Sequence, residues 1–389
     1  MIKITEKSKC TGCYACAAIC PKACISMQSD EEGFWYPVIE EIKCINCGAC
    51  EQACPVFSYL PSEKKEDDII AYAVVHKDIA IRERSSSGGV FTAIASYVIE
   101  HGGVVFGAAF DEKFQVKHRY IETMEELEIL RGSKYVQSCI GDTYKQAEVF
   151  LKEGRKVLFS GTPCQIEGLL TYLKRDYDNL LTQDIICHGV PSPMVWAQYI
   201  SWQEKKSGSK ITSVSFRNKK YGWKQFSMKI GYANSTEYVM PLTKDSYLQA
   251  FLKNLCLRPS CYACSFKKTN RKSDFTLADF WGINHILPDW KDDRGTSLVL
   301  VNSAKGQKVF RCIEDSIAVE KVDMSSAVQY NIALTHSVPL APKREEFMKV
   351  VRTDGFEKAK EAFLDPTFMQ CLIRKGKELL KRLLRMVGK

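Results

Sequence analysis

Two cysteine runs near the amino terminus constrain this chain of 389 residues more than any other feature. Each run has the spacing C-x2-C-x2-C-x3-C followed by proline, which is typical of a pair of 4Fe-4S clusters. Three thiolates of one run bind one cluster, and the fourth binds the neighbouring cluster. The chain is therefore predicted to move single electrons. We expect the first cluster on Cys10, Cys13, Cys16 and Cys54, and the second on Cys44, Cys47, Cys50 and Cys20.

Two other uses of these cysteines are less compatible with the sequence. Disulfide bonds need an oxidising compartment, whereas the first residues show no apolar segment of a secretory signal, so a cytoplasmic location is expected. Zinc is satisfied by four ligands and does not require the repeated triplet with a remote Cys-Pro. Cys24, the extra cysteine of the first run, is expected to be a buried packing residue.

Composition and charge limit which folds and which partners are possible for the rest of the chain. A hydrophobic content of 45% is enough to build a sizeable core beyond the cluster module, and no run of apolar residues predicts a membrane span. Residues 215–275 carry twelve Lys or Arg against three Asp or Glu, which equals the excess of +9 for the whole chain. Interleaved aromatics such as Trp223 would suit nucleic acid, but an acidic redox partner or an anionic coenzyme is favoured, and no nucleic-acid partner is predicted.

The pattern along the chain predicts several domains. Residues 1–60 form a ferredoxin-like domain, the charged segment 61–68 is a linker, 69–322 form a larger α/β body, and 323–389 are helical. Alternating apolar and polar residues over 211–240 indicate a β-hairpin or small meander inserted in the body. The expected strands are 69–76, 104–110, 156–160 and 297–301, and the expected helices are 90–100, 141–153 and 165–174.

Two turns in the body are candidate binding sites for an anionic cofactor. The segment from Ser86 to Gly89 precedes a helix and offers hydroxyls, unhindered N–H groups and the positive end of the helix dipole. The segment from Gly161 to Gln165 follows a buried strand and opens a helix, where α/β folds bind cofactors. Neither turn is a GxGxxG or Walker A loop, so neither a Rossmann nicotinamide site nor nucleotide hydrolysis is supported.

A third cysteine group, Cys256, Cys261 and Cys264, lacks a fourth ligand in its own segment. Candidates for that ligand are Cys187, Cys164 and Cys139; Cys187 is favoured because it ends an apolar strand and precedes a tight turn. A structural zinc with the same ligands is the alternative to a cluster. His188, which follows Cys187, is a candidate proton donor, and no other catalytic residue is assigned.

The carboxyl end, residues 372–389, predicts a basic amphipathic helix. Such a helix can lie on an anionic membrane surface, which would place the protein at the inner membrane face, or it can pack its leucines on the body. Packing on the body is the more common arrangement for amphipathic helices.

Six motifs, in order between about residues 71 and 301, make the chain resemble one known family, the coenzyme F-420 hydrogenase/dehydrogenase beta-subunit family. An ordered series of this kind is far more specific than any member of it. The motifs are Ser86 to Gly89, Gly132 to Ser138, Ser160 to Gln165, Cys187 to Pro191, the Cys256, Cys261 and Cys264 group, and Ala278 to Ile283.

The resemblance implies an FAD in the α/β body, a third 4Fe-4S cluster nearby, and exchange with a deazaflavin coenzyme or ferredoxin. The chain would then be an iron-sulfur flavoprotein oxidoreductase that passes electrons between such a donor and an unidentified organic substrate. The alternative is an electron-transfer subunit of a larger complex without a substrate of its own. The resemblance implies flavin contacts for Ser86, Ser87, Gly88, Gly89, Lys134, Ser138, Gly161, Thr162, Pro163 and Gln165.

Overall fold

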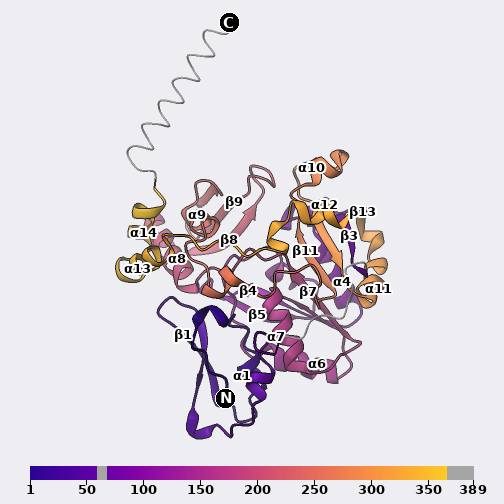
Figure 1. Cartoon of the computed structure of the whole chain (residues 1–389). Coiled ribbons are helices and arrows are strands. Elements are labelled where there is room, and N and C mark those ends of the chain that lie inside the picture. Colours follow the sequence, from indigo (N-terminus) through magenta and orange to yellow (C-terminus); the bar gives the residue numbers. More distant parts are fainter. Residues whose placement is uncertain (59–67, 366–389) are drawn as a thin grey trace, which may run out of the picture.

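A mixed eight-stranded sheet forms the centre of the computed structural model, which describes residues 1–58 and 68–365 (Figure 1). The strand order is β13-β3-β12-β11-β7-β6-β4-β5; the four strands from β11 to β4 run parallel, and the other neighbours pair antiparallel. The carboxyl ends of the parallel strands therefore meet at one edge. The strands are β3 (Ile70–His76), β4 (Val104–Phe110), β5 (Val116–Ile121), β6 (Val157–Ser160), β7 (Leu180–Ile185), β11 (Phe275–Asp279), β12 (Ser297–Val301) and β13 (Ile317–Val322).

Apolar side chains on both faces of the central strands explain why this sheet is covered on both sides. In β4, Val105 packs in a core beneath α4 (Val90–Glu100), whereas Val104 and Phe106 pack in a second core with α6 (Thr143–Lys152) and α7 (Pro163–Leu173). Successive residues of a strand point to opposite faces, so one strand serves both cores. All residues of β12 are buried, as expected for a central strand.

The amino-terminal module is small and contains few apolar side chains of its own. It consists of a hairpin of β1 (Ile25–Ser29) and β2 (Trp35–Ile39), the short helices α1 (Ala15–Ile19) and α2 (Ala49–Gln52), and the turns η1 (Lys7–Lys9) and η2 (Glu41–Lys43). Its interior is largely made of cysteines, together with Ile2 and Ile25. A domain of this size depends on clusters or on docking to gain stability.

The module docks closely on the α/β body. Phe34 is fully buried in a core that the body supplies, and Arg344 pairs through both terminal nitrogens with Glu32. Arg258, also fully buried, donates to the backbone oxygens of Cys10 and Trp35 at 2.8 and 3.0 Å and to Gln137 Oε1 at 3.2 Å. The predicted linker falls largely on residues 59–67, outside the described part of the chain, and the predicted domain boundaries stay a prediction.

A second, three-stranded sheet of order β10-β9-β8 corresponds to the meander expected over 211–240. Its strands are β8 (Ile211–Asn218), β9 (Ser227–Tyr232) and β10 (Glu237–Pro241). Around buried Trp196 it shares a core with α8 (Pro193–Ser207), α9 (Ser246–Leu252), α13 (Arg344–Asp354) and α14 (Phe356–Phe363). The described carboxyl-terminal helices thus belong to the body's packing, and the basic helix predicted for 372–389 lies outside the described residues.

Shorter elements complete the body. They are α3 (Ile79–Arg84), α5 (Leu127–Leu130), η4 (Pro259–Ala263), α10 (Ile283–Ile286), η5 (Pro288–Trp290), α11 (Ala304–Cys312), η6 (Glu314–Ser316), α12 (Met324–Gln329) and η7 (Ile332–Leu334). None of the helices in the described ranges is both long and apolar enough to traverse a bilayer.

The mixed α/β body predicted from the sequence is confirmed, with informative differences in single elements. The expected helix 165–174 begins earlier, at Pro163, because Thr162 and Gln165 form a reciprocal capping box there. Strands β5 and β13 were not predicted, since exposed charges such as Lys117 and Glu320 interrupt their apolar pattern. Both are edge strands, where charged side chains are common.

The hydrogen bonds of the buried Arg258 guanidinium give the first testable prediction. We expect Arg258→Lys to destabilise the docking of the module by about 2–3 kcal/mol. The three acceptors are bound by three different nitrogens of the guanidinium, and the single nitrogen of a lysine ammonium cannot lie within hydrogen-bond distance of all of them. Limited proteolysis and chemical denaturation, with the exposed Arg175→Lys as the matched control, would measure the loss. Equal protease resistance of R258K and wild type would contradict the role given to this side chain.

Candidate cluster sites and cofactor cleft

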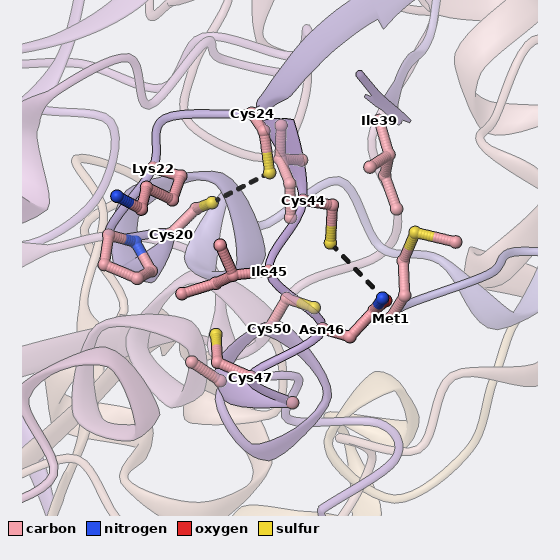
Figure 2. A pocket seen from close by; sticks show the side chains of 14 residues that line it. Met1, Cys20, Lys22, Cys24, Ile39, Cys44, Ile45, Asn46, Cys47 and Cys50 are labelled. Carbon is pink, nitrogen blue, oxygen red and sulfur yellow. Dashed lines mark hydrogen bonds between the residues drawn. The ribbon is translucent and has the colours of Figure 1, made fainter. Parts of the chain in front are cut away.

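Five cysteines of the amino-terminal module line one pocket, shown in Figure 2. Four of them, Cys20, Cys44, Cys47 and Cys50, are the set that the motif assigns to the second cluster, and the fifth is Cys24. Cys24 lies beside them, buried, with its Sγ 3.3 Å from the Sγ of Cys20. The backbone N–H of Ile2 donates to Cys50 Sγ at 3.3 Å, a hydrogen bond of the kind that stabilises a thiolate. A ring of thiols with apolar neighbours has the donor chemistry that an iron-sulfur cluster requires.

The set assigned to the first cluster also comes together. Burial raises the pKa of the Cys13 thiol, and the charges of Cys16, Cys54 and Cys10 raise it further. Burial, together with Cys10 and Cys54, likewise raises the pKa of Cys16 to about 12. Thiolates this close repel one another in a buried site, so their ionised forms need the positive charge of cluster iron. The structure therefore brings the cysteines of the two runs together, and their assignment to two crossed clusters stays a prediction.

A further pocket, in the body, is lined by Cys164, Cys187, Cys261 and Cys264. Cys164 lies in the first turn of α7, Cys187 follows β7, and the other two belong to the turn around η4. Burial raises the pKa of Cys261, and Cys187, Cys164 and Cys264 all add to the shift, which shows that the four thiols share one environment. They fit a 4Fe-4S cluster by donor type and number.

The spacing of these thiols bears on the zinc alternative. Zinc holds its sulfur ligands at about 2.3 Å, which draws four thiolates into contact with each other. In the described ranges 1–58 and 68–365, no three His, Cys, Asp or Glu side chains gather closely enough to hold a single ion. A cluster at these four thiols, rather than a zinc ion, therefore stays a prediction that the iron content of the protein tests.

The structure places Cys256 apart from Cys261 and Cys264, the other members of this third group. Cys256 is fully buried in the hydrophobic core with Trp196 and Tyr247, and it does not line the four-thiol pocket. Burial raises the pKa of Cys256 to about 12, and none of the four pocket cysteines contributes to that shift. Pro259 starts a tight turn after Cys256, which separates this thiol from Cys261 and Cys264. Both Cys187 and Cys164, proposed as alternatives for one position, line the pocket together.

Helix α7 places the first cluster's cysteines next to this pocket. Cys164 and Gly168 are one turn apart, so they lie on the same face of the helix. A Cβ added to Gly168 would lie 3.1 Å from the Sγ of Cys13, which means that the module approaches the helix backbone here. Cys13 also contributes to the raised pKa of Cys164, after burial, Cys264 and Cys187. Cys13 and Cys164 thus lie at the same face of α7.

A cavity of about 650 Å³ opens at the carboxyl ends of β6 and β7. Its volume is that of a cofactor or drug-sized ligand site. Eight of the ten residues predicted to contact flavin line it: Ser86, Ser87, Gly89, Lys134, Ser138, Gly161, Thr162 and Gln165. Pro163 lines the four-thiol pocket instead. Gly88 supports the turn from behind, where an added Cβ would lie 2.3 Å from the oxygen of Val74.

A hydrogen-bonded chain of polar side chains crosses the floor of this cleft. Gln165 Nε2 donates to Ser138 Oγ at 3.1 Å, and Ser138 lies 2.6 Å from Nδ1 of His118. His118 Nε2 lies 3.0 Å from the oxygen of Ser160, so this nitrogen carries the proton and Nδ1 accepts from the serine hydroxyl. Burial lowers the pKa of His118 to about 4, which keeps the imidazole neutral at physiological pH. His118 was missed in the sequence, although it stands on the buried face of an alternating segment.

Two further polar side chains of the cleft, Lys134 and Gln183, provide a cation and a hydrogen-bond acceptor for a ligand. Burial lowers the pKa of Lys134 to about 7, and its ammonium donates to the carbonyl oxygens of Leu130, Arg131 and Gly132 at 3.0–3.2 Å. Within residues 1–58 and 68–365, the buried oxygen Oε1 of Gln183 has no hydrogen-bond partner. A cation and an unpartnered acceptor beside two N–H-rich turns fit a ligand with phosphates and ring N–H groups, as FAD has.

His188 and its neighbours join the cleft to the four-thiol pocket. The segment from Cys187 to Val190 lines both cavities, so it is their common wall. His188 Nε2 lies 2.8 Å from Asn254 Oδ1, and burial lowers the pKa of the imidazole. A neutral His188 donates its single N–H to Asn254, so its predicted role as a proton donor remains a prediction.

The basic segment 215–275 is less available to partners than its composition suggested. Arg217 pairs with Asp279 at 2.9 Å, Arg271 pairs with Asp184 at 3.2 Å, and Arg258 is enclosed at the module interface. Lys268 and Lys272 both approach the buried carboxylate of Glu167. Much of this positive charge is therefore used inside the fold, and the sum of charges in the sequence overstates the docking surface.

Models of known protein families match most of the chain. Two models of one family, described as the beta subunit of coenzyme F420 hydrogenase/dehydrogenase, match it: the N-terminal model covers residues 71–142 and the C-terminal model covers residues 154–327. A 4Fe-4S dicluster domain matches residues 9–58. No curated protein matches the sequence. A chain of the xenon-derivatised F420-reducing [NiFe] hydrogenase complex from Methanosarcina barkeri is 17% identical, with a TM-score of 0.46 over 78% of this chain and 92% of that chain.

The neutral His118 can be tested directly. In the oxidised protein with ¹³C-labelled histidines, we expect the His118 resonance, assigned with His118→Gln, to stay constant from pH 7.5 to 5, since its pKa of about 4 lies below this window. Histidines of the urea-unfolded chain should titrate near 6.5. The unfolded state takes up the proton first, so the network loses stability as pH falls from about 6.5 towards 4. A His118 resonance that titrates above pH 6 would contradict the hydrogen-bonded arrangement.

Proposed function

The chain belongs to the coenzyme F420 hydrogenase/dehydrogenase beta-subunit family and carries a 4Fe-4S dicluster domain, and we propose that it is an iron-sulfur flavoprotein oxidoreductase. It would pass electrons between a ferredoxin-type or reduced deazaflavin donor and an organic substrate. The observation that carries this proposal is the common wall from Cys187 to Val190, which separates a four-thiol pocket from a cofactor-sized cleft. The four thiols on one side of this wall would hold a cluster that supplies single electrons, and the residues on the other side would hold the ligand that receives them.

Three thiol sets would form a relay that leads to the wall. The second set, around Cys47, includes an exposed cysteine and is the natural entry point for electrons from another protein. The crossed ligation of the two runs places the first set beside it. Cys13 of that set faces Cys164 of the third set across one turn of α7. Each step of the relay thus has protein contacts that hold neighbouring sites close.

The residues of the cleft would bind and orient an FAD, which supplies the conversion between electron pairs and single electrons when bound. The turns at Ser86 and Gly161 provide N–H and hydroxyl donors for phosphates. Lys134, which lines the cleft, would contribute a positive charge that favours a ligand with negative charge. Neutral His118 fixes the direction of the Ser138 hydroxyl, and the Gln183 oxygen is free to accept from a ring N–H.

A second function, electron transfer as a subunit of a larger complex, is favoured by the description of the matched family as a beta subunit. In that case the isolated chain would bind its cofactors but would turn over no organic substrate. Assays of the purified chain alone, with a reduced one-electron donor and candidate acceptors, separate the two functions.

Iron content tests the third thiol set. Anaerobically purified protein should contain about twelve irons per chain, from three clusters of four, together with one FAD. Cys164→Ser should remove about four irons, because a cluster that loses one of its thiolates becomes labile, whereas Cys256→Ser should remove none. Eight irons with one zinc in the wild type, or loss of iron in C256S alone, would refute the ligand set.

The lowered pKa of Lys134 predicts how cofactor binding depends on pH. In the free protein, the ammonium loses its proton as pH rises through about 7, and a bound anion raises this pKa by favouring the charged form. We therefore expect the FAD dissociation constant to increase about five- to tenfold between pH 6 and pH 8. Lys134→Met should bind more weakly and lose most of this dependence, while exposed Lys113→Met should keep it. An equal pH dependence in K134M would contradict the assignment.

A further inference from the structure

Three cationic side chains, Arg258, Lys267 and Arg271, line the four-thiol pocket. Among the described residues that line it, none is an Asp or Glu. Arg258 and Arg271 are 0% and 2% exposed, so water and salt do little to screen their charges. The buried Asp184 pairs with Arg271 at 3.2 Å and compensates its charge. The electrostatic potential of the pocket therefore depends on the partners of the other two cations.

Neither Arg258 nor Lys267 has a carboxylate partner in the part of the chain that the structure describes. The three acceptors of the Arg258 guanidinium are two backbone oxygens and one amide oxygen, all of them neutral. The Lys267 ammonium donates to the backbone oxygens of Cys187 and Ala333, the latter at 2.9 Å. These hydrogen bonds satisfy the donors but do not neutralise the charges. Two positive charges therefore remain beside the four thiols.

An acidic side chain on α7, Glu167, does not cancel these charges. It lies three residues after Cys164 but does not line the pocket. Lys268 and Lys272 approach its carboxylate at 3.2 and 3.3 Å, so its own charge is already compensated. The region around the third thiol set is therefore positive.

The cations beside the second thiol set lie at the surface. Lys22 lines that pocket, but its side chain is exposed, and in Figure 2 its ammonium points away from the cysteine sulfurs. The amino-terminal ammonium of Met1 lies beside Cys44 (Figure 2), and Glu51 pairs with it at 3.2 Å. Charges that are exposed to water or paired act weakly on a neighbouring group. The second set is thus electrostatically different from the third.

Hydrogen bonds to sulfur act in the same direction as the buried cations. The backbone N–H of Val190 donates to Cys261 Sγ at 3.4 Å, and Thr162 Oγ1 lies 3.2 Å from Cys164 Sγ. The reduction potential of an iron-sulfur cluster depends on nearby charge, on hydrogen bonds to its sulfurs and on its exposure to solvent. Because reduction adds one negative charge to a cluster, a fixed positive charge beside it favours the reduced form.

We propose that Lys267 and Arg258 make the third cluster the most readily reduced of the three, so that electrons entering through the module collect beside the cleft. This inference rests on the proposed function, which assigns a 4Fe-4S cluster to each thiol set. Each transfer moves one electron, supplied by the ferredoxin-type donor, and forms or breaks no bond. Lys267 distinguishes the third set from the first, because Arg258 also contacts the backbone of Cys10.

A redox titration of the anaerobic full chain, followed by electron paramagnetic resonance, tests this order. The signal that is missing in Cys164→Ser identifies the third cluster, and in the wild type it should appear at a higher potential than the signals of the module clusters. Lys267→Met should lower the equilibrium constant for reduction of the third cluster about tenfold, which corresponds to about 59 mV. Lys267→Arg, which keeps the charge, should retain most of the wild-type potential. Lys22→Met, which removes an exposed cation, is the matched control and should leave this potential unchanged.

Three results would overturn the proposal. The first is a third-cluster potential at or below those of the module clusters in the wild type, which needs no variant. The second is an unchanged third-cluster potential in K267M, and the third is an equal decrease in K267M and K22M. Failure of the proposed function looks different, since the wild-type chain would then contain only eight irons and no third signal.

Discussion

The buried guanidinium of Arg258 is the interaction on which the other sites depend. It joins the backbone of Cys10 and Trp35, both in the amino-terminal module, to Gln137 in the body, and it also lines the four-thiol pocket. Burying a charge is costly unless its hydrogen bonds are satisfied, and here the partners on both sides satisfy it. The module can therefore dock in one orientation, which sets Cys13 against Gly168 and one helical turn from Cys164. A loosely tethered module would not hold two clusters at a constant separation.

The sheet supplies the second constraint. Strands β6 and β7 run parallel, so the chain leaves both at the same edge, and the turn after each strand brings a cysteine and a set of polar groups to that edge. Cys164 faces the thiol pocket, while Ser138, His118 and Gln165 form the polar floor of the cleft. The four-thiol pocket and the cofactor-sized cleft thus lie on opposite sides of one short wall. The arrangement follows from parallel topology, and the residues that fill it determine which cofactors fit.

The sequence predicted the features that depend on local spacing. The strands 104–110 and 297–301 and the turn at Gly161 follow from apolar runs and capping residues that a reader can count. The crossed cysteine sets follow from the repeat in the same way and stay a prediction. Prediction from the sequence failed where contacts between remote segments determine the position of a side chain. Cys256 has the spacing of a ligand, but the core around Trp196 encloses it, and no local pattern shows this. His118 is recognised as a site residue only in the structure, where β5 pairs with β4 and His118 contacts Ser138. The basic segment looked like a docking surface because its acidic partners, Asp279, Asp184 and Glu167, are remote in sequence.

The central claim is that the third thiol set connects the module to the ligand in the cleft. Stopped-flow spectroscopy of anaerobic protein, mixed with a reduced ferredoxin, follows the bleaching of clusters and flavin separately. In the wild type we expect the clusters to be reduced first and the flavin to follow. In Cys164→Ser, with FAD and the two module clusters retained, flavin reduction should slow by more than about tenfold, since the electron must cross the gap that the third cluster fills. Flavin reduction at the wild-type rate in this variant would show that electrons reach the cleft by another route.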